Sequence, residues 1–274
     1  SYNQPTQRID FTNDTATALV KGSPAGGSLY YNFAVGNTNF AYCADAGNSA
    51  PAPIQRFNYE NDTLSLVFRG AMNTRLTNHT GGTTSTVGGY NAAATGNHDY
   101  GWINGGYKLY SVPAPSGYYE AYSAIDRIDY SNDTADTLRR SYTTNRFGNG
   151  CATGTNNYGY WMGVDRNDYS NDTTNAVAKG NLTESVGNSG GIGNSNYGYV
   201  GGGESPSYKS TVQRVDYSND TATASPKGPL SIVRYNNSTT GNQDFGYFAG
   251  GNPGSASIVL RVDYSNDTAT ASPK

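Results

Sequence analysis

The hydrophobic positions of this chain alternate with small residues over short runs. In FAYC, YGYV and FGYF, at 40–43, 197–200 and 245–248, aromatic residues stand two positions apart. Residues two apart on a strand point to the same face, so the aromatic side chains share one face, while small residues leave room for a neighbouring sheet. No stretch shows sustained helical periodicity, and the pattern therefore predicts short strands.

A second alternating run, RVDY, leads into residues that form turns. In RVDYSNDTATAS, at 214–225, the Ser, Asn and Asp side chains can hydrogen-bond the local backbone. This segment therefore predicts a hairpin, with strands in RVDY and TATAS joined by SND.

The hairpin recurs six times along the chain, and its fourteen residues at 214–227 return unchanged at 261–274. The aspartates of its NDT triplets are 48, 71, 39, 48 and 47 residues apart, so the basic period is near 47. The six hairpins lie at 7–21, 55–69, 126–140, 165–179, 213–227 and 260–274. A second element recurs five times, as TNFAYCADAG from Thr38, GNHDYGWINGG from Gly96, GTNNYGYWMG from Gly154, GNSNYGYVGGG from Gly193 and GNQDFGYFAGG from Gly241.

Each period thus predicts four short strands, which is typical of a propeller blade. The 35 glycines, 24 tyrosines and charged fraction of 14% also favour many strands and turns over helices. We expect an all-β fold, a single β-propeller domain over residues 1–274. It would hold five full repeats and a half repeat, closed as five or six blades.

The repeat resembles the kelch repeat, whose family folds as a β-propeller. The resemblance rests on a glycine doublet that closes an apolar strand, a variable loop, and a strand ending in Asp-Tyr before a polar turn and Thr. It covers nearly the whole chain, but the tryptophan expected after the turn is missing and Tyr-Asp is inverted. The sequence SNDTATASPKGPLS, with TGN before an aromatic strand, is similar to kelch-like repeat surface and tail proteins of aquatic bacteriophages and bacteria.

Two repeats differ in length from the others. The 71-residue interval carries additional polar residues at 73–91 and 107–122, which we expect to form loops at blade edges. The 39-residue interval loses most of the loop after WMG.

The residues offer no constellation for catalysis. The two histidines, His79 and His98, have no acidic or cysteine cluster beside them, and His98 is expected to be a turn residue. We expect no enzyme activity, cofactor or metal. Asp129, Ser131 and Asp133 have calcium-ligand spacing, but the downstream glutamate is absent, and a turn whose side chains satisfy backbone amides is favoured.

An arginine recurs near the start of each hairpin, two residues before an acid or amide. Arg8, Arg56, Arg127, Arg166, Arg214 and Arg261 precede Asp10, Asn58, Asp129, Asp168, Asp216 and Asp263. Same-face spacing predicts a structural ladder in which guanidinium and carboxylate meet within or between blades. Because the net charge is −3, a basic ring for an anionic ligand is disfavoured, and no nucleic-acid partner is expected.

The NDT triplets are also N-glycosylation sequons, which would suit an extracellular surface. They stand at Asn13, Asn61, Asn132, Asn171, Asn219 and Asn266. Cys43 and Cys151 belong to strands of non-adjacent blades and are expected to be unpaired, largely buried thiols. No apolar run is long enough to span a membrane, and Ser1 opens no signal peptide.

These patterns favour a non-enzymatic module for adhesion on an extracellular, cell-surface or virion structure, with glycans as possible ligands. Tyrosine, asparagine and glycine in the loops can stack on sugar rings and bond hydroxyls. The alternative is a purely structural subunit of a filament or phage appendage, self-associating head to tail by completion of its half-blade. An enzyme similar to galactose oxidase is a third, disfavoured alternative.

Overall fold

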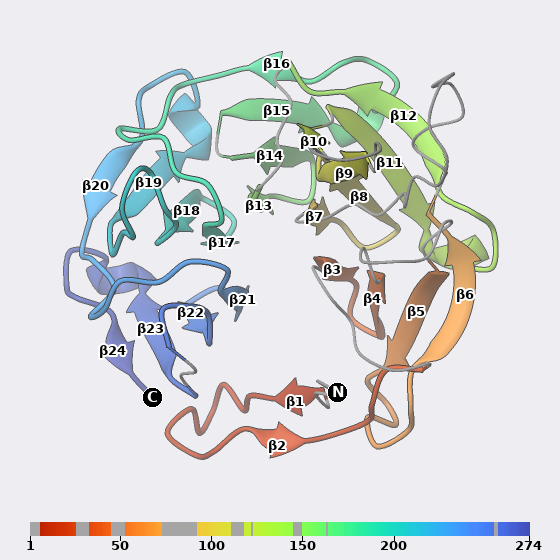
Figure 1. Ribbon diagram of the computed structural model, residues 1–274, viewed down its shortest axis with the longest axis horizontal. Helices are drawn as coiled ribbons and strands as arrows, with labels where there is room; N and C mark the ends of the chain where they lie inside the picture. The colour runs from red at the N-terminus through yellow and green to blue at the C-terminus, as the bar shows by residue number, and fades with distance from the viewer. Residues whose placement is uncertain are drawn as a thin grey trace. The chain divides into compact units, whose positions relative to one another are not determined.

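The computed structural model describes residues 6–25, 33–44, 53–72, 92–110, 118–121, 123–144, 150–162, 164–254 and 257–274. It is an all-β propeller of five four-stranded antiparallel blades (Figure 1). The helices in these residues are 3-10 turns of three residues each, η1 to η4. The predicted fold class is therefore confirmed, with five full blades and one two-stranded hairpin for the half repeat.

The chain divides into two units, each described by itself. The first comprises Ser1–Ile9, Thr17–Asn149 and Asn171–Asn175, and the second Asp10–Ala16, Gly150–Ser170 and Ala176–Lys274. The expectation of one domain over the whole chain stays a prediction.

The first unit holds two blades and β1–β2. Blade one runs β3-β4-β5-β6, at Phe33–Gly36, Phe40–Ala44, Pro53–Asn58 and Val67–Ala71. Blade two runs β7-β8-β11-β12, at Ala93–Gly96, Tyr100–Asn104, Ala124–Asp129 and Leu138–Tyr142. The half repeat pairs β1, Gln7–Arg8, with β2, Leu19–Val20.

The second unit holds three blades whose first strands, β13, β17 and β21, follow one another side by side (Figure 1). Blade three runs β13-β14-β15-β16, at Ala152–Gly154, Tyr158–Trp161, Asp165–Asp168 and Val177–Ala178. Blade four runs β17-β18-β19-β20, at Gly190–Gly193, Tyr197–Gly201, Val212–Asp216 and Ser225–Lys227. Blade five runs β21-β22-β23-β24, at Ser238–Gly241, Phe245–Ala249, Val259–Asp263 and Ser272–Pro273.

The predicted hairpin forms, but its turn is longer than expected. In blade four the third strand ends at Asp216, η3 occupies Tyr217–Asn219, and β20 begins only at Ser225. The segment TATA therefore belongs to the turn. Equivalent 3-10 turns lie at η1, Tyr130–Asn132, η2, Tyr169–Asn171, and η4, Tyr264–Asn266.

One of the two segments expected to be loops contains regular structure. Within 107–122, β9, Tyr107–Tyr110, pairs with β10, Tyr118–Ala121, as an antiparallel hairpin. The prediction of a loop without strands there is wrong, because the YKLY and YYEA runs are rich in tyrosine, which favours strands, and they pair with each other. The other segment, 73–91, lies outside the described residues.

Glycine in the second strand allows neighbouring sheets to approach closely, as its small size predicted. A Cβ atom on Gly198 would lie 2.5 Å from Thr153 Cγ2, and one on Gly246 would lie 2.1 Å from Ile192 Cδ1. The next aromatic residue fills the core instead: Tyr199 and Tyr247 are fully buried. The alternation of YGY thus places a ring on one face and a neighbouring blade against the other.

No helix among the described residues has the length and apolar character needed to cross a lipid bilayer.

Candidate functional site

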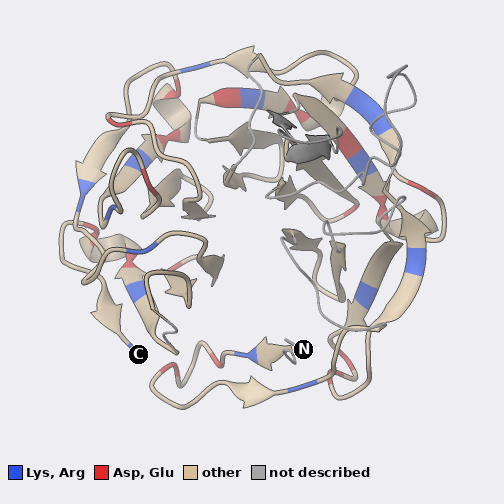
Figure 2. Cartoon of the chain, viewed as in Figure 1, with Lys and Arg blue, Asp and Glu red and all other residues tan. Residues whose placement is uncertain are grey.

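Most charged residues lie in the third and fourth strands and the turns between them, and the first and second strands of the five blades carry none (Figure 2). The aspartate of an NDT triplet accepts bonds from the preceding repeat, except that Asp14 of the half repeat accepts them from blade five. Blade three supplies the donors to Asp220 of the next repeat. Asp220 Oδ2 accepts from Tyr160 Oη at 2.9 Å and from Arg166 Nη1 at 2.8 Å, and Lys179 Nζ lies 3.3 Å from Oδ1. We call this aspartate with its donors a node.

Five of the six nodes share one composition: an aromatic donor from the second strand, an arginine from the third strand, and a lysine or arginine in the fourth strand or directly after it. They are Asp133 with Tyr42, Arg56 and Arg69; Asp172 with Trp102, Arg127 and Arg140; Asp220 with Tyr160, Arg166 and Lys179; Asp267 with Tyr199, Arg214 and Lys227; and Asp14 with Tyr247, Arg261 and Lys274. Each lies within one of the two units.

The predicted arginine ladder exists, but its partners differ from the expectation. Arg214 bonds Asp267 of the next repeat at 2.8 Å, while Asp216, two residues away on its own strand, caps η3. Oδ1 of Asp216 accepts hydrogen bonds from the Ser218 backbone N at 2.9 Å and from the Ser218 hydroxyl at 2.7 Å. Asp10, Asp129, Asp168 and Asp263 make the same contacts with Thr12, Ser131, Ser170 and Ser265.

Aromatic rings also contact the node arginines. The guanidinium of Arg214 lies 4.2 Å above the Tyr197 ring, and that of Arg261 lies 4.3 Å above Phe245. The first aromatic residue of each pair, Tyr197 or Phe245, therefore makes a cation–π contact with an arginine. Only the second aromatic, Tyr199 or Tyr247, reaches the aspartate.

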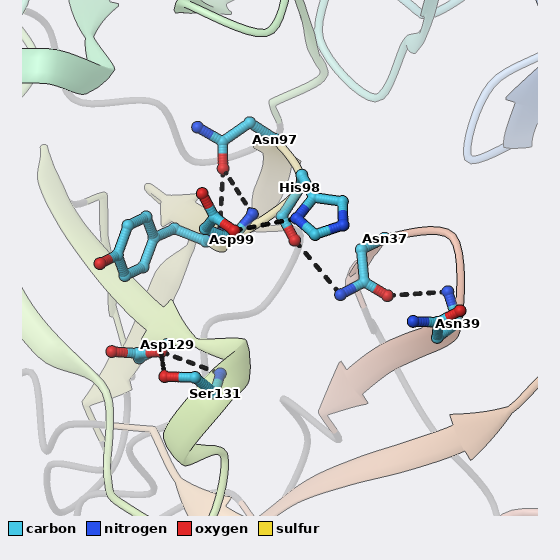
Figure 3. A network of polar contacts seen from close by, with 8 residues as sticks. Asn37, Asn39, Asn97, His98, Asp99, Asp129 and Ser131 are labelled. Atoms are coloured by element: carbon cyan, nitrogen blue, oxygen red, sulfur yellow. Dashed lines mark hydrogen bonds and ion pairs between the residues drawn. The ribbon is translucent and has the colours of Figure 1, made fainter.

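His98 lies in the turn between the first and second strands of blade two. Asn97 Oδ1 accepts from the backbone N of Asp99 at 2.9 Å, and Asn37 Nδ2 donates to the His98 carbonyl at 3.2 Å (Figure 3). The imidazole is exposed and contacts Asp99 at 2.9 Å through Nδ1. His98 is a turn residue, as predicted, whereas His79 lies outside the described residues.

The capped turn contains Asp129, Ser131 and Asp133, the three residues with calcium-ligand spacing. Asp129 Oδ1 accepts from Ser131 (Figure 3). Asp133 Oδ2 instead accepts from Tyr42 at 3.0 Å and Arg56 at 2.8 Å. The two carboxylates therefore serve different contacts within a turn of the kind that the sequence predicted.

The sequon asparagines lie at the tips of these turns. All six are exposed, and the hydroxyl of the sequon threonine donates to the Asn side-chain oxygen, as from Thr63 to Asn61 at 2.9 Å. Their glycosylation stays a prediction.

Both cysteines are free, as predicted. Burial raises the pKa of Cys43 to about 12 and that of Cys151 to about 11, so neither thiol is ionised near neutral pH.

The nodes shift the acidity of their members. Burial alone would raise the pKa of Asp267, but hydrogen bonds from Tyr199 and Lys227 and the charge of Arg214 outweigh it and lower the value. Burial and the bond to Asp133 raise the pKa of Tyr42 to about 12. The ionised aspartate and neutral tyrosine are therefore the forms that the fold stabilises.

We expect the free energy of unfolding to fall as pH decreases below about 4. A carboxyl with a lowered folded pKa contributes stability above its unfolded pKa, and this contribution is lost as pH falls through the folded value. Urea unfolding between pH 6 and pH 3 measures it. Asp267→Asn should show a shallower acid loss than Asp263→Asn, and equal slopes would contradict the assignment.

A second cluster lies on two loops, one between β18 and β19 of blade four and one between blades four and five, and sequence analysis did not single it out. The rings of Tyr208 and Tyr235 are stacked with centroids 4.6 Å apart and planes inclined by 13°. Tyr208 is 45% exposed. We call these two residues the tyrosine platform.

Backbone hydrogen bonds hold the loops that carry the platform. Glu204 pairs with Gly187, the Tyr235 amide donates to the Asn252 carbonyl at 3.0 Å, and the Arg234 amide donates to the Lys209 carbonyl at 3.0 Å. Gly202 and Gly203 have φ angles of +67° and +96°, which only glycine adopts readily, and they turn the chain out of β18. The platform thus rests on a paired backbone.

Side chains tie the same loops to the blade core. Buried Gln213 accepts from the Glu184 amide at 3.0 Å, and Lys209 Nζ lies 3.1 Å from Glu184 Oε2. A hydrogen bond from Thr211 and the charge of Lys209 lower the pKa of Glu184. The segment next to Tyr208 is therefore anchored by an ionised carboxylate.

Polar groups surround the exposed ring. The Tyr208 hydroxyl hydrogen-bonds that of Tyr235 and raises its pKa, and Glu204 adds a smaller contribution in the same direction. Ser205, Ser207 and Asn236 are exposed on the same loops. The available sequence signal was the length of the loop after YGYVGGG, which exceeds the one after WMG.

Comparisons with known proteins identify the fold and nothing finer. No family model matches the chain. No curated protein matches it either. A solved structure titled "Structure of YjhT" is similar, with a TM-score of 0.66 and 8% sequence identity, over 88% of this chain and 83% of that chain. At this identity the similarity shows a shared fold alone, and the kelch and phage resemblances stay predictions.

Proposed function

We propose that the chain is a non-enzymatic binding module that adheres to cell-surface glycans through its tyrosine platform. The propeller fold suits a binding or structural module. The observation that supports glycan recognition is a stacked tyrosine pair on anchored loops, in which the Tyr208 ring is exposed. Extracellular or virion localisation belongs to the same proposal.

A sugar ring has an apolar face and a rim of hydroxyls, and the platform offers a counterpart to both. The free face of Tyr208 can stack on the apolar face of the sugar. The carboxylate of Glu204 and the hydroxyls of Ser205 and Ser207 can bond the rim. Asn236 adds an amide with both a donor and an acceptor.

Anchoring of the loops would favour affinity. The paired backbone and the Glu184–Lys209 ion pair fix the rings before a ligand arrives, so less conformational entropy is lost on binding. Binding sites commonly lie on loops that a rigid scaffold positions in this way.

A glycan array tests the proposal with three variants. The intact chain should bind a restricted set of glycans, and Tyr208→Ala should lose at least about tenfold in affinity because the stacking surface is removed. Tyr208→Phe should keep most of the stacking. Tyr59→Ala is a matched control, since Tyr59 is 47% exposed elsewhere on the chain. Absence of any bound glycan, or equal loss in the control, would refute the proposal.

A structural subunit of a filament or appendage is the second candidate function. The two-stranded β1–β2 sheet favours it, because one edge of β1 pairs with no strand among the described residues and exposed edges can pair with other chains. Head-to-tail self-association would appear as concentration-dependent assembly in sedimentation. A chain that stays monomeric over a wide concentration range would exclude this role.

A further inference from the structure

Stacked tyrosine pairs recur in the described part of the chain, and the tyrosine platform differs from the others in its surroundings. Four pairs have ring centroids 4.6–5.0 Å apart: Tyr42–Tyr130, Tyr160–Tyr217, Tyr199–Tyr264 and Tyr208–Tyr235. In each of the first three, one ring is fully buried and its hydroxyl donates to the aspartate of a node. The platform instead lies on loops, and Tyr208 is 45% exposed. A reagent in solvent therefore reaches this pair more readily than the other three.

The two platform rings lie with their hydroxyl ends together. The ring planes are inclined by only 13°, and the centroids are 4.6 Å apart. Because the Tyr208 hydroxyl hydrogen-bonds that of Tyr235, the two rings point in the same direction across the stack. The carbon atoms next to the hydroxyl-bearing carbon of one ring therefore lie beside their counterparts on the other ring.

This arrangement favours coupling of the two rings after oxidation. A phenol that loses one electron and its hydroxyl proton becomes a phenoxyl radical. The unpaired electron is shared with the carbons next to the hydroxyl-bearing carbon, in orbitals perpendicular to the ring. In a stacked pair these orbitals point at the neighbouring ring, and reactants that are already in contact need no bimolecular encounter. The backbone hydrogen bond from Arg234 to Lys209 joins the two loops beside the rings and holds this contact.

We propose that Tyr208 and Tyr235 form a site of oxidative cross-linking, at which a one-electron oxidant joins them as dityrosine. The oxidant, such as the oxidised haem of a peroxidase, takes one electron from each ring, and each hydroxyl proton passes to solvent. A bond then forms between one carbon of each ring, next to the hydroxyl-bearing carbon. The hydrogen on each bonded carbon moves, as a proton, to the oxygen of the same ring. The product therefore has two hydrogen atoms fewer than the pair.

The cross-link joins the loop between β18 and β19 to the loop that precedes β21. Its two ends are 27 residues apart in the sequence, so the bond lowers the entropy of the unfolded chain and should raise the melting temperature. The inference needs only the two phenols, their stacking and the exposure of Tyr208. It is therefore independent of glycan binding.

Light-driven oxidation of the intact chain at low protein concentration tests the inference. The reagent is a ruthenium tris-bipyridine complex with persulfate, which removes single electrons from exposed tyrosines. The monomer should lose the mass of two hydrogen atoms. Trypsin, which cleaves after Arg214 and Arg234, should then release a peptide with Tyr208 joined to a peptide with Tyr235. In urea that unfolds the chain, the yield of this link should fall at least about tenfold, because the rings are no longer held together.

Three variants give a matched comparison. Tyr208→Phe and Tyr235→Phe keep the ring and remove the hydroxyl, so the link should be lost in both while the chain stays folded. Tyr59→Phe should form the link in full. Tyr59 is 47% exposed, but its ring meets that of Phe57 at 5.9 Å, and phenylalanine does not form a phenoxyl radical.

Three results would overturn the inference. These are a monomer in which Tyr208 is oxidised but not joined to Tyr235, an equal yield of the link in urea, and dityrosine found only between chains. Full retention of dityrosine in the Tyr208→Phe monomer would place the cross-link at another pair and would also contradict it.

Discussion

Asp267→Asn should lower the free energy of unfolding by about 3 kcal/mol. The carboxylate is buried and accepts from Tyr199 at 2.9 Å and Arg214 at 2.8 Å, with Lys227 Nζ at 3.2 Å. The amide keeps the shape but removes the charge, so two cations lose their only close carboxylate in the described structure. Because the Arg214 side chain is partly exposed, the expected loss of stability lies near the lower end of the range for breaking a buried ion pair.

Asp263→Asn is the matched control, four residues earlier in the same turn. Its Oδ1 accepts from the Ser265 amide at 2.9 Å, and an asparagine oxygen can accept the same bond. Asn and Asp are similar N-cap residues, so the change should cost less than about 0.5 kcal/mol. Urea unfolding of both variants at pH 7 gives the comparison. Equal losses would mean that the node contributes no more than a turn cap.

Asn167→Val should raise the free energy of unfolding by about 1–3 kcal/mol. Asn167 lies in β15 and is fully buried, and neither atom of its amide has a partner in the described chain. The equivalent positions hold apolar residues: Phe57, Ile128, Val215 and Val262. Valine removes two unsatisfied polar atoms and keeps a β-branched side chain suited to a strand.

The reverse change, Val215→Asn, gives the control in blade four. It buries an amide at a site that is 4% exposed and should lower the free energy of unfolding by at least about 2 kcal/mol. Unfolding in urea with an unchanged slope would show that stability, and not the denatured state, has changed. A destabilised Asn167→Val chain would mean that the amide has a partner essential to the fold.

The blade could be predicted from sequence because its signals are local and repeated. Alternation in YGYV sets which residues face the core, and Ser218 and Asp216 form a turn within three residues of each other. The sequence contains six copies of the hairpin but only five of the aromatic strand, and this difference predicted five full blades and one half repeat.

The partners in the nodes could not be predicted with the same rules. Strand spacing placed Arg214 beside Asp216, yet Asp216 is used by the nearest backbone amide, and Arg214 bonds an aspartate 53 residues away. Such a contact depends on how one blade packs against the next, and nothing in a single repeat reports it. Asn167 is similar, since its strand pattern does not reveal that its amide is left without a partner.

The tyrosine platform required the structure for a different reason. Tyr208 and Tyr235 are 27 residues apart, in loops that do not repeat, and a backbone hydrogen bond from Arg234 to Lys209 joins the two loops beside the rings. Composition indicated that tyrosines in loops could contact sugars. It did not indicate which of the 24 tyrosines would be exposed, stacked and anchored.

Calorimetric titration of the intact chain with a glycan selected on the array is the most direct test of the proposed function. The account predicts saturable binding with one site per chain, unchanged in Tyr59→Ala and weakened at least about tenfold in Tyr208→Ala and Tyr235→Ala. Full affinity in both platform variants, each shown to be folded, would contradict it.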